Sequence, residues 1–139
     1  MGTSLSNSEQ GFLVNAREYY QLVQNTINNS RLVIASDVSF NEVDTNECYV
    51  RGVLTLLTGF ELHIAEYVIT SPILERLKYR YHLQNTDNTL VSRWDNVPHH
   101  PQVATFPHHQ HDANGTVHAC PPMDIATVLK AVIPLVIFK

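Results

Sequence analysis

The chain has 139 residues, which is enough for one domain with a two-layer core but not for two independent cores. Hydrophobic residues make up 44% of it, yet its longest apolar run, Ala131 to Phe138, is much shorter than the ~20 residues of a membrane span. Nine basic and thirteen acidic side chains give a net charge of −4, so any binding to nucleic acid must depend on local positive charge. We therefore expect a globular protein with no membrane contact.

The cysteines and the N-terminus both favour a cytoplasmic protein. Cys48 and Cys120 lie far apart without CxxC spacing, so they cannot build a disulfide framework. Residues 1–10 are polar and lack the basic start and apolar core of an export signal, which predicts a flexible leader. We expect a single domain over residues 11–139.

Hydrophobic patterning predicts an α+β fold with one antiparallel sheet. Apolar residues at spacings of three and four predict a helix over Gly11 to Asn28. Five later segments have the composition or alternation of strands: Arg31 to Phe40, Glu47 to Leu57, Glu61 to Val68, Leu77 to Leu83 and Thr89 to Asp95. Short turns between them predict an antiparallel meander of about five strands. Helical spacing returns over Met123 to Ile133, with Pro134 as the expected terminator, and Leu135 to Phe138 is either a short strand or a partner-binding tail.

A histidine-rich segment separates the last predicted strand from the C-terminal helix. Asn96 to Pro122 shows no periodicity, which predicts a long loop, and structureless loops beyond about 12–15 residues are usually functional or disordered. Five of the eight histidines lie between His99 and His111, and an apolar-Pro-His-His tetrapeptide occurs twice, as Val97 to His100 and as Phe106 to His109. This composition favours a functional loop.

Arginines near this loop favour phosphodiester cleavage. Guanidinium groups bind phosphate bidentately, and imidazole titrates near neutrality, where general acids and bases work best. The candidate phosphate ligands are Arg51, Arg80 and Arg93. The candidate acids and bases are His82, His99, His100, His108, His109 and His111, with the carboxylates Glu66 and Asp95 as orienting groups or as bases themselves.

Some of the candidate residues also have a purely structural interpretation. The alternating side chains of Lys78, Arg80 and His82 are equally consistent with the solvated face of an antiparallel sheet. Tyr79, Tyr81 and Trp94 share the alternation of neighbouring leucines, which predicts core aromatics rather than base-stacking platforms.

A metal site is a further alternative to acid–base catalysis. His108, His109 and His111, with Cys120 as a fourth group, could supply nitrogen and sulfur ligands to zinc, although no helical spacing supports this set. The other cysteine, Cys48, is expected to be a small buried side chain. The leading hypothesis needs no metal and no other cofactor.

Three linked motifs resemble those of a known family. They are Tyr79-Arg80-Tyr81-His82, then the run from Arg93 to Pro101, then the run from Thr105 to His111. The TumE family of bacterial type II toxin/antitoxin toxins shares a Tyr-x-Tyr-His strand, an Arg-(Tyr/Trp)-Asp-Asn-x-Pro-His-His segment and a Phe-Pro-His-His-x-His segment in this order. Arg51-Gly52 and Glu66-Tyr67 also resemble that family, and the overall similarity spans roughly Cys48 to Val132. The chain departs from it at Asp87-Asn88, where an Asp-Gly turn is frequent.

The resemblance implies a small intracellular toxin that acts on RNA and is neutralised by a cognate antitoxin. Together with the arginines and histidines, it predicts a metal-independent endoribonuclease, in which one histidine activates the ribose 2′-hydroxyl and a second protonates the leaving oxygen. His82 and His99 are the first-choice pair, and Arg93 and Arg80 are the first-choice phosphate ligands. The alternative is a non-enzymatic binding module whose histidine-rich loop holds a metal or a protein partner. In a third hypothesis the apolar tail, Ala131 to Phe138, contributes to a homodimer or antitoxin interface.

Overall fold

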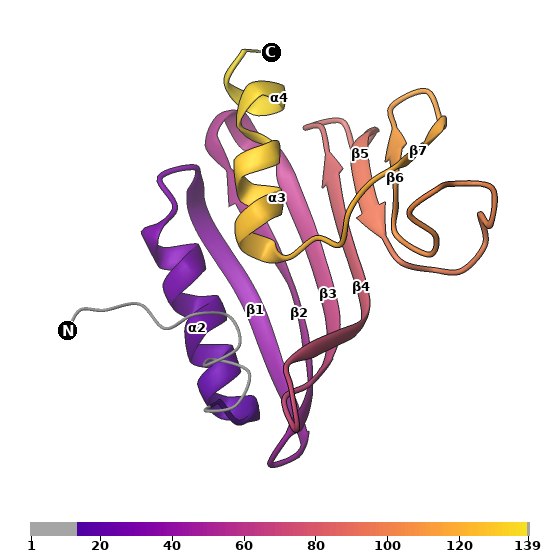
Figure 1. Ribbon diagram of the computed structural model, residues 1–139. Coiled ribbons are helices and arrows are strands. Elements are labelled where there is room, and N and C mark those ends of the chain that lie inside the picture. The colour runs from indigo at the N-terminus through magenta and orange to yellow at the C-terminus, as the bar shows by residue number, and fades with distance from the viewer. Residues whose placement is uncertain (1–13, 139) are drawn as a thin grey trace.

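Both helical regions lie on one face of a single antiparallel sheet (Figure 1). The structure is a computed structural model that describes residues 14–138. The seven strands follow one another in the sheet in sequence order, so the sheet is a meander. The predicted α+β architecture is confirmed, but the sheet has two strands more than the five predicted. The flexible leader predicted for residues 1–10 lies outside the described residues.

The first helix, α2, covers Ala16–Asn29 and starts at a side-chain cap. The Asn15 side chain accepts a hydrogen bond from the Glu18 backbone, and the Glu18 side chain accepts one from the Asn15 backbone. This capping box satisfies two backbone donors that a helix start otherwise leaves unpaired. The cap explains why the helix begins later than the apolar pattern predicts. Its buried stripe, which faces the sheet, consists of Ala16, Tyr19, Val23 and Ile27.

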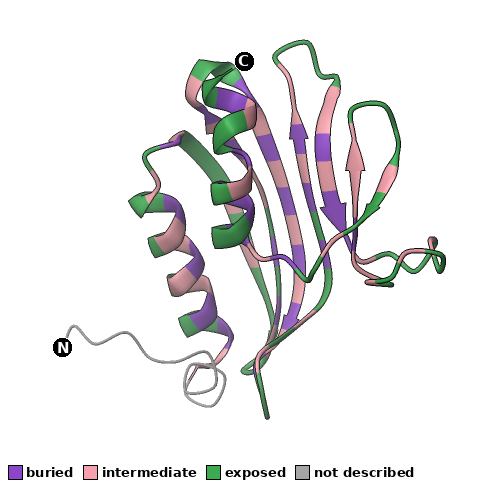
Figure 2. Ribbon diagram, turned by 45° about the horizontal axis from the view of Figure 1, so that its top comes forward, coloured by how far each residue is buried: buried purple, intermediate pink, exposed green. Residues whose placement is uncertain are grey.

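The first five strands match the predicted segments, with ends that differ by a few residues, and the last two were not predicted. The strands are β1 (Val33–Asp44), β2 (Glu47–Leu56), β3 (Glu61–Ile69), β4 (Glu75–Gln84), β5 (Leu90–Asp95), β6 (His109–Asp112) and β7 (Val117–Ala119). A short 3-10 turn, η1 (Leu57–Gly59), connects β2 to β3, and its positive φ angles at Thr58 and Gly59 produce the tight reversal. Burial alternates along the central strands, as Figure 2 shows.

The sheet face under the helices carries the core. Tyr79, Tyr81 and Trp94 are buried there, which confirms their prediction as core aromatics, and Cys48 is buried as predicted. Leu77 was predicted to share this face, but it is 41% exposed. The pairing of β3 with β4 shifts register between Tyr67 and Val68, so Leu77 is the extra residue of a bulge.

The predicted long loop contains strand structure. Residues 96–108 have no strand, but β6 and β7 follow them as a hairpin closed by a turn at Gly115 (φ 82). These strands were missed because they are short and because His109, Gln110, His111 and Asp112 are all polar, which hides a period of two.

The C-terminal segment is helical throughout. Helix α3 covers Ile125–Ala131, with Asp124 as its cap, and α4 covers Ile133–Ile137. Pro134 was expected to end a helix, but it lies in the first turn of α4, where its missing N–H costs no hydrogen bond. The tail is therefore neither a strand nor extended. Within residues 14–138, no helix is both long and apolar enough to span a membrane.

Candidate active site

The sheet face turned away from the helices carries three rows of paired side chains. We call it the outer face. Directly paired residues of antiparallel strands point to the same side, with Cβ atoms about 4.5–5.5 Å apart. The histidine row is His63, His82, Arg93 and His111; the arginine row is Arg51, Ala65, Arg80, Asp95 and His109; the tyrosine row is Tyr49, Tyr67 and Lys78. Residues from β2 to β6 therefore converge on one surface.

An imidazole cluster lies at the β5–β6 end of this face. It consists of Asp95, His100, His109 and His111. His109 Nε2 lies 3.0 Å from Asp95 Oδ1 and 3.1 Å from His111 Nε2. His100 comes from the loop after β5, and its ring packs edge-on against both other imidazoles, with centroid distances of 4.8 and 5.4 Å. Asp95 and His109 are buried, whereas His100 and His111 are partly exposed.

Hydrogen-bond partners constrain the protons of this cluster. The backbone carbonyl of Pro107 lies 2.8 Å from His109 Nδ1 and can only accept, so that nitrogen carries a proton. Arg93 Nη2 can only donate and lies 3.3 Å from His111 Nε2, so this nitrogen accepts. His109 Nε2 then faces two acceptors, Asp95 and His111. Either a second proton on His109 or a bound cation satisfies this arrangement.

Arg93 lies between the cluster and His82. Its Nε is 3.2 Å from Asp95 Oδ2, an ion pair without the alignment of a hydrogen bond. In the strand register Arg93 is paired with His82 on one side and with His111 on the other. One guanidinium thus has an imidazole on each neighbouring strand.

The pKa values of both flanking histidines are lowered. For His82 the main cause is burial, followed by the positive charge of Arg93 and by contributions from His63 and Arg80. Burial also lowers the pKa of His111, again followed by Arg93, while Asp95 acts in the opposite direction. Both imidazoles therefore favour the neutral form.

Two predicted histidines belong neither to the cluster nor to the histidine row. His108 precedes β6, and its Nδ1 lies 2.7 Å from the hydroxyl of Tyr79, a residue of the helix face. Burial lowers the pKa of His108. His99 is exposed in the loop, next to His100. The structure therefore brings His82, His100, His109 and His111 to the outer face but does not place His108 there.

Glu66 lies on the opposite side of the sheet. It is 2% exposed and accepts hydrogen bonds from the hydroxyls of Tyr19 and Tyr81. Arg76, which the bulge in β4 admits to the helix face, lies 3.4 Å from Glu66 Oε2. Burial and the neighbouring carboxylate raise the pKa of both tyrosines. Of the two predicted carboxylates, only Asp95 belongs to the imidazole cluster.

The ligand set that could hold a metal differs from the predicted one. Donor atoms of His100, His109 and His111 lie within 4.8 Å of one another. His109 Nδ1 is fixed by a backbone carbonyl, an arrangement typical of metal-binding histidines. His100 thus takes the position expected of His108, while Cys120 lies beside Thr105. The adjacent guanidinium of Arg93 opposes a cation at this point.

A groove of about 660 Å³ extends along the outer face from the arginine row. Its floor includes Arg51, Arg80 and Tyr49, and Val97 and Pro98 of the loop lie along its side. Sequence reasoning had placed Arg51 and Arg80 near a site but had missed Tyr49 and Tyr67. The alternation of β2 puts Tyr49 on the face of Arg51, but that relation becomes useful only once strand register is known.

Comparison with known proteins gives one family. The model of the family described as Toxin TumE matches residues 22–137. This range includes every strand, and with them Arg93 and its paired residues His82 and His111. No curated protein and no solved structure was found to match the chain.

Proposed function

Because this chain belongs to the TumE family of toxins, we propose that it is the toxin of a type II toxin–antitoxin pair and cleaves RNA on the outer face of its sheet. The observation that carries this proposal is the placement of Arg93 between His82 and His111 on adjacent strands. Cleavage through the ribose 2′-hydroxyl needs a base, an acid and a cation at the phosphate, and these three side chains can supply them.

In the proposed reaction His82 is the base. Its lowered pKa keeps the imidazole neutral near pH 7, so it can take the proton of the 2′-hydroxyl. The 2′-oxygen then bonds to phosphorus while the bond from phosphorus to the 5′-oxygen breaks. Arg93 stabilises the negative charge on the phosphoryl oxygens, with a second cation from Arg80 on the neighbouring strand.

His111 is the proposed acid. Because its Nε2 accepts from Arg93, neutral His111 carries its proton on Nδ1. It gives that proton to the leaving 5′-oxygen, while its Nε2 takes a proton from His109 Nε2, 3.1 Å away. Asp95 holds the positive charge that His109 carries in this state. The products are a 2′,3′-cyclic phosphate and a 5′-hydroxyl, and the reaction needs no metal. His111 replaces His99 as the partner of His82, because His99 comes from the loop and not from the histidine row.

Product analysis tests this chemistry. Purified protein is incubated with RNA at low salt with and without EDTA, and the new ends are identified by mass spectrometry. We expect cleavage in EDTA with cyclic phosphate ends, and no cleavage at a position where a single 2′-deoxynucleotide replaces the ribonucleotide. Cleavage of the 2′-deoxy position, or 5′-phosphate ends, would contradict the mechanism.

A metal centre is a second candidate, and the convergence of His100, His109 and His111 favours it. In this case the cluster holds a transition-metal ion such as zinc, either for catalysis or as a binding module. Elemental analysis of the purified protein and the EDTA arm of the same assay distinguish the two. Stoichiometric metal with EDTA-sensitive cleavage would replace the acid–base mechanism by a metal-dependent one.

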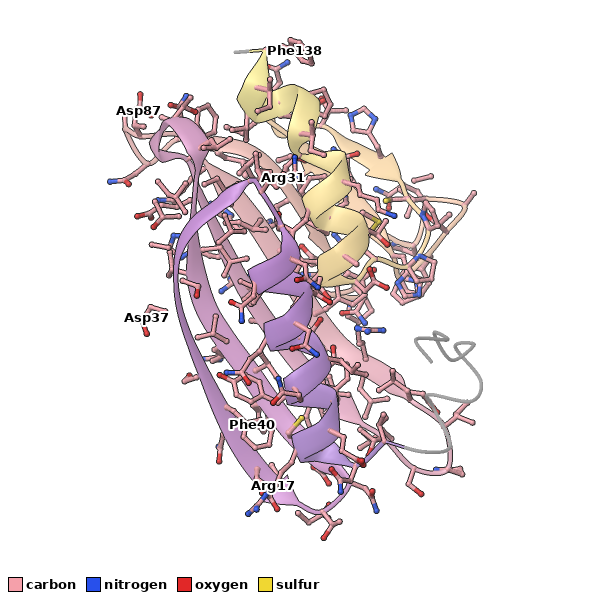
Figure 3. All side chains as sticks on the ribbon, turned by 90° about the vertical axis from the view of Figure 1, so that its left-hand side faces the viewer. Arg17, Arg31, Asp37, Phe40, Asp87 and Phe138 are labelled. Atoms are coloured by element: carbon pink, nitrogen blue, oxygen red, sulfur yellow. The ribbon has the colours of Figure 1, made fainter. Side chains whose placement is uncertain are left out.

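The toxin family implies an antitoxin partner, and we propose that this partner binds the helix side in the cytoplasm. A groove of about 480 Å³ between α2 and α4 has apolar walls that include Leu57, Ile133 and Ile137. Arg31, labelled in Figure 3, and Lys130 add positive charge to it, so an apolar segment with acidic residues fits. Sedimentation of the chain alone and with its antitoxin separates this contact from a homodimer, and we expect Ile133→Glu to weaken the heteromeric assembly.

A further inference from the structure

The groove on the outer face combines exposed aromatic and cationic side chains. Tyr49 is 41% exposed, and its ring stacks on Tyr67 with centroids 4.7 Å apart and an interplanar angle of 19°. Both tyrosines line the groove. An aromatic ring that is left exposed gains no free energy from burial in the core. Exposed aromatic side chains that line a groove are therefore candidates for ligand contact.

Tyr67 is held in place from the neighbouring strand. Its hydroxyl donates a hydrogen bond to Glu47, and this bond raises the pKa of Tyr67 to about 12. A neutral, anchored Tyr67 fixes the plane of the Tyr49 ring that stacks on it. The pair therefore forms a preorganised platform, which reduces the entropy lost when a planar ligand binds.

Cations connect this platform to the imidazole cluster. Four of the nine Lys and Arg residues of the chain lie in the three rows: Arg51, Lys78, Arg80 and Arg93. Successive rows are two residues apart along each strand, or roughly 6.6–6.8 Å. The arginine row thus lies between the tyrosine platform and the proposed cleavage position. Among the carboxylates of these strands, Glu47 is paired with Tyr67 and Asp95 with His109.

We propose that the groove binds an unpaired nucleotide of single-stranded RNA, with its base on Tyr49 and its phosphates on Arg51 and Arg80, and so restricts the toxin to single-stranded substrates. The inference rests on the proposed RNA cleavage and adds the substrate class to it. A planar base can stack on an exposed ring only when it is not enclosed in a duplex, and every base has a face suited to such stacking. Val97 and Pro98 of the loop after β5 also line the groove and add apolar contact area for a base.

Equilibrium binding tests the platform without requiring cleavage. The probe is a short fluorescein-labelled 2′-O-methyl RNA, which cannot react through its 2′-oxygen, and binding is followed by fluorescence anisotropy at low salt. The same strand annealed to its complement is the duplex arm. Tyr49→Ala removes the ring, and Tyr49→Phe keeps it. Phe138→Ala removes an exposed aromatic that follows α4 and does not line the groove.

We expect Tyr49→Ala to weaken binding of the single strand by about tenfold, since base–aromatic stacking accounts for roughly 1–3 kcal/mol per base. Tyr49→Phe and Phe138→Ala should bind as the parent does, and the weaker duplex binding should be the same for all four proteins. Equal binding of the single strand by Tyr49→Ala and the parent, or tighter binding of the duplex, would overturn the inference.

Cleavage by the parent is measured separately, so the two proposals can fail independently. If the parent cleaves RNA while Tyr49→Ala binds and cleaves equally well, RNA cleavage stands and the platform is wrong. If Tyr49→Ala loses probe binding but the parent cleaves nothing, the groove binds RNA and the catalytic proposal is wrong. If Tyr49→Ala loses antitoxin binding and keeps RNA binding, the groove is a protein interface and the inference is overturned.

Discussion

At the scale of single residues, the position of each charge relative to its neighbours determines what it can do. His82 and His111 carry the same side chain as the exposed His118, but their pKa values are lowered by burial and by Arg93. His118 instead lies 2.8 Å from Asp112 at the surface, and this contact lowers the pKa of Asp112. Of these three histidines, only His82 and His111 lie beside Arg93, whose guanidinium could bind a phosphate.

The lowered pKa of His82 predicts the acid side of the pH profile. A base must be neutral, and an ordinary histidine is half protonated near pH 6.5. Because the pKa of His82 is below this value, the midpoint of the fall in kcat/KM for RNA cleavage at acid pH should lie below about 6.5. His63 also lowers this pKa, so His63→Ala should move the midpoint upward. A midpoint above that of an ordinary histidine, or one that His63→Ala lowers, would exclude His82 as the base.

Glu66 is predicted to stabilise the fold rather than to react. Its loss would leave the hydroxyls of Tyr19 and Tyr81 and the charge of Arg76 without their shared acceptor. We expect Glu66→Ala to lower the free energy of unfolding in urea by about 3 kcal/mol, while the exposed control Glu75→Ala changes it little. RNA cleavage by the folded Glu66→Ala protein should persist. Unchanged stability with lost cleavage would instead support the catalytic role considered from the sequence.

At the scale of elements, the period of two predicted which residues share a face. It put Lys78, Arg80 and His82 on a common side of their strand, and they are found so. The same rule explains why His108 and His109 separate, because consecutive residues at the start of β6 point to opposite faces. This could not be predicted, since the polar sequence of β6 did not reveal a strand.

Other features of the site depend on long-range geometry that pattern does not encode. The return of His100 onto β6 is a loop contact, and residues 96–108 have no periodicity from which to infer it. The bulge that exposes Leu77 and turns Arg76 inward arises from the pairing of two strands, not from either strand alone. Sequence therefore predicted five of the seven strands and named most residues of the candidate site, but not which of them meet.

Gly52 provides a test of the β1–β2 pairing that supports the arginine row. A Cβ atom at this position would lie 2.5 Å from the carbonyl oxygen of Asp37 and 2.7 Å from the Cα of Val38. Both are backbone atoms, so β1 and β2 would have to separate. We expect Gly52→Ala to lower the free energy of unfolding by about 1–3 kcal/mol in urea titrations. Ser39→Ala on the same hairpin is the control, and equal stability of both variants would show that the strands are less closely packed than described.

At the scale of the whole molecule, the sheet separates the surface proposed for the antitoxin from the surface proposed for RNA. The helix face holds the core and the groove proposed for the antitoxin, while the outer face holds the rows of histidine, arginine and tyrosine. With a net charge of −4, RNA binding must depend on the cations of the outer face and should weaken steeply as salt rises. On these proposals, a single domain presents its antitoxin and its RNA with different surfaces.

The most direct test of the proposed acid–base mechanism is the RNA cleavage rate of single-histidine variants in EDTA. We expect His82→Ala and His111→Ala each to be about 10²–10⁴-fold slower than the parent, as is typical when a general acid or base is removed. His99→Ala and the control His118→Ala should retain the parent rate. Cleavage by His82→Ala and His111→Ala at the parent rate would contradict the assignment of acid and base to the histidine row.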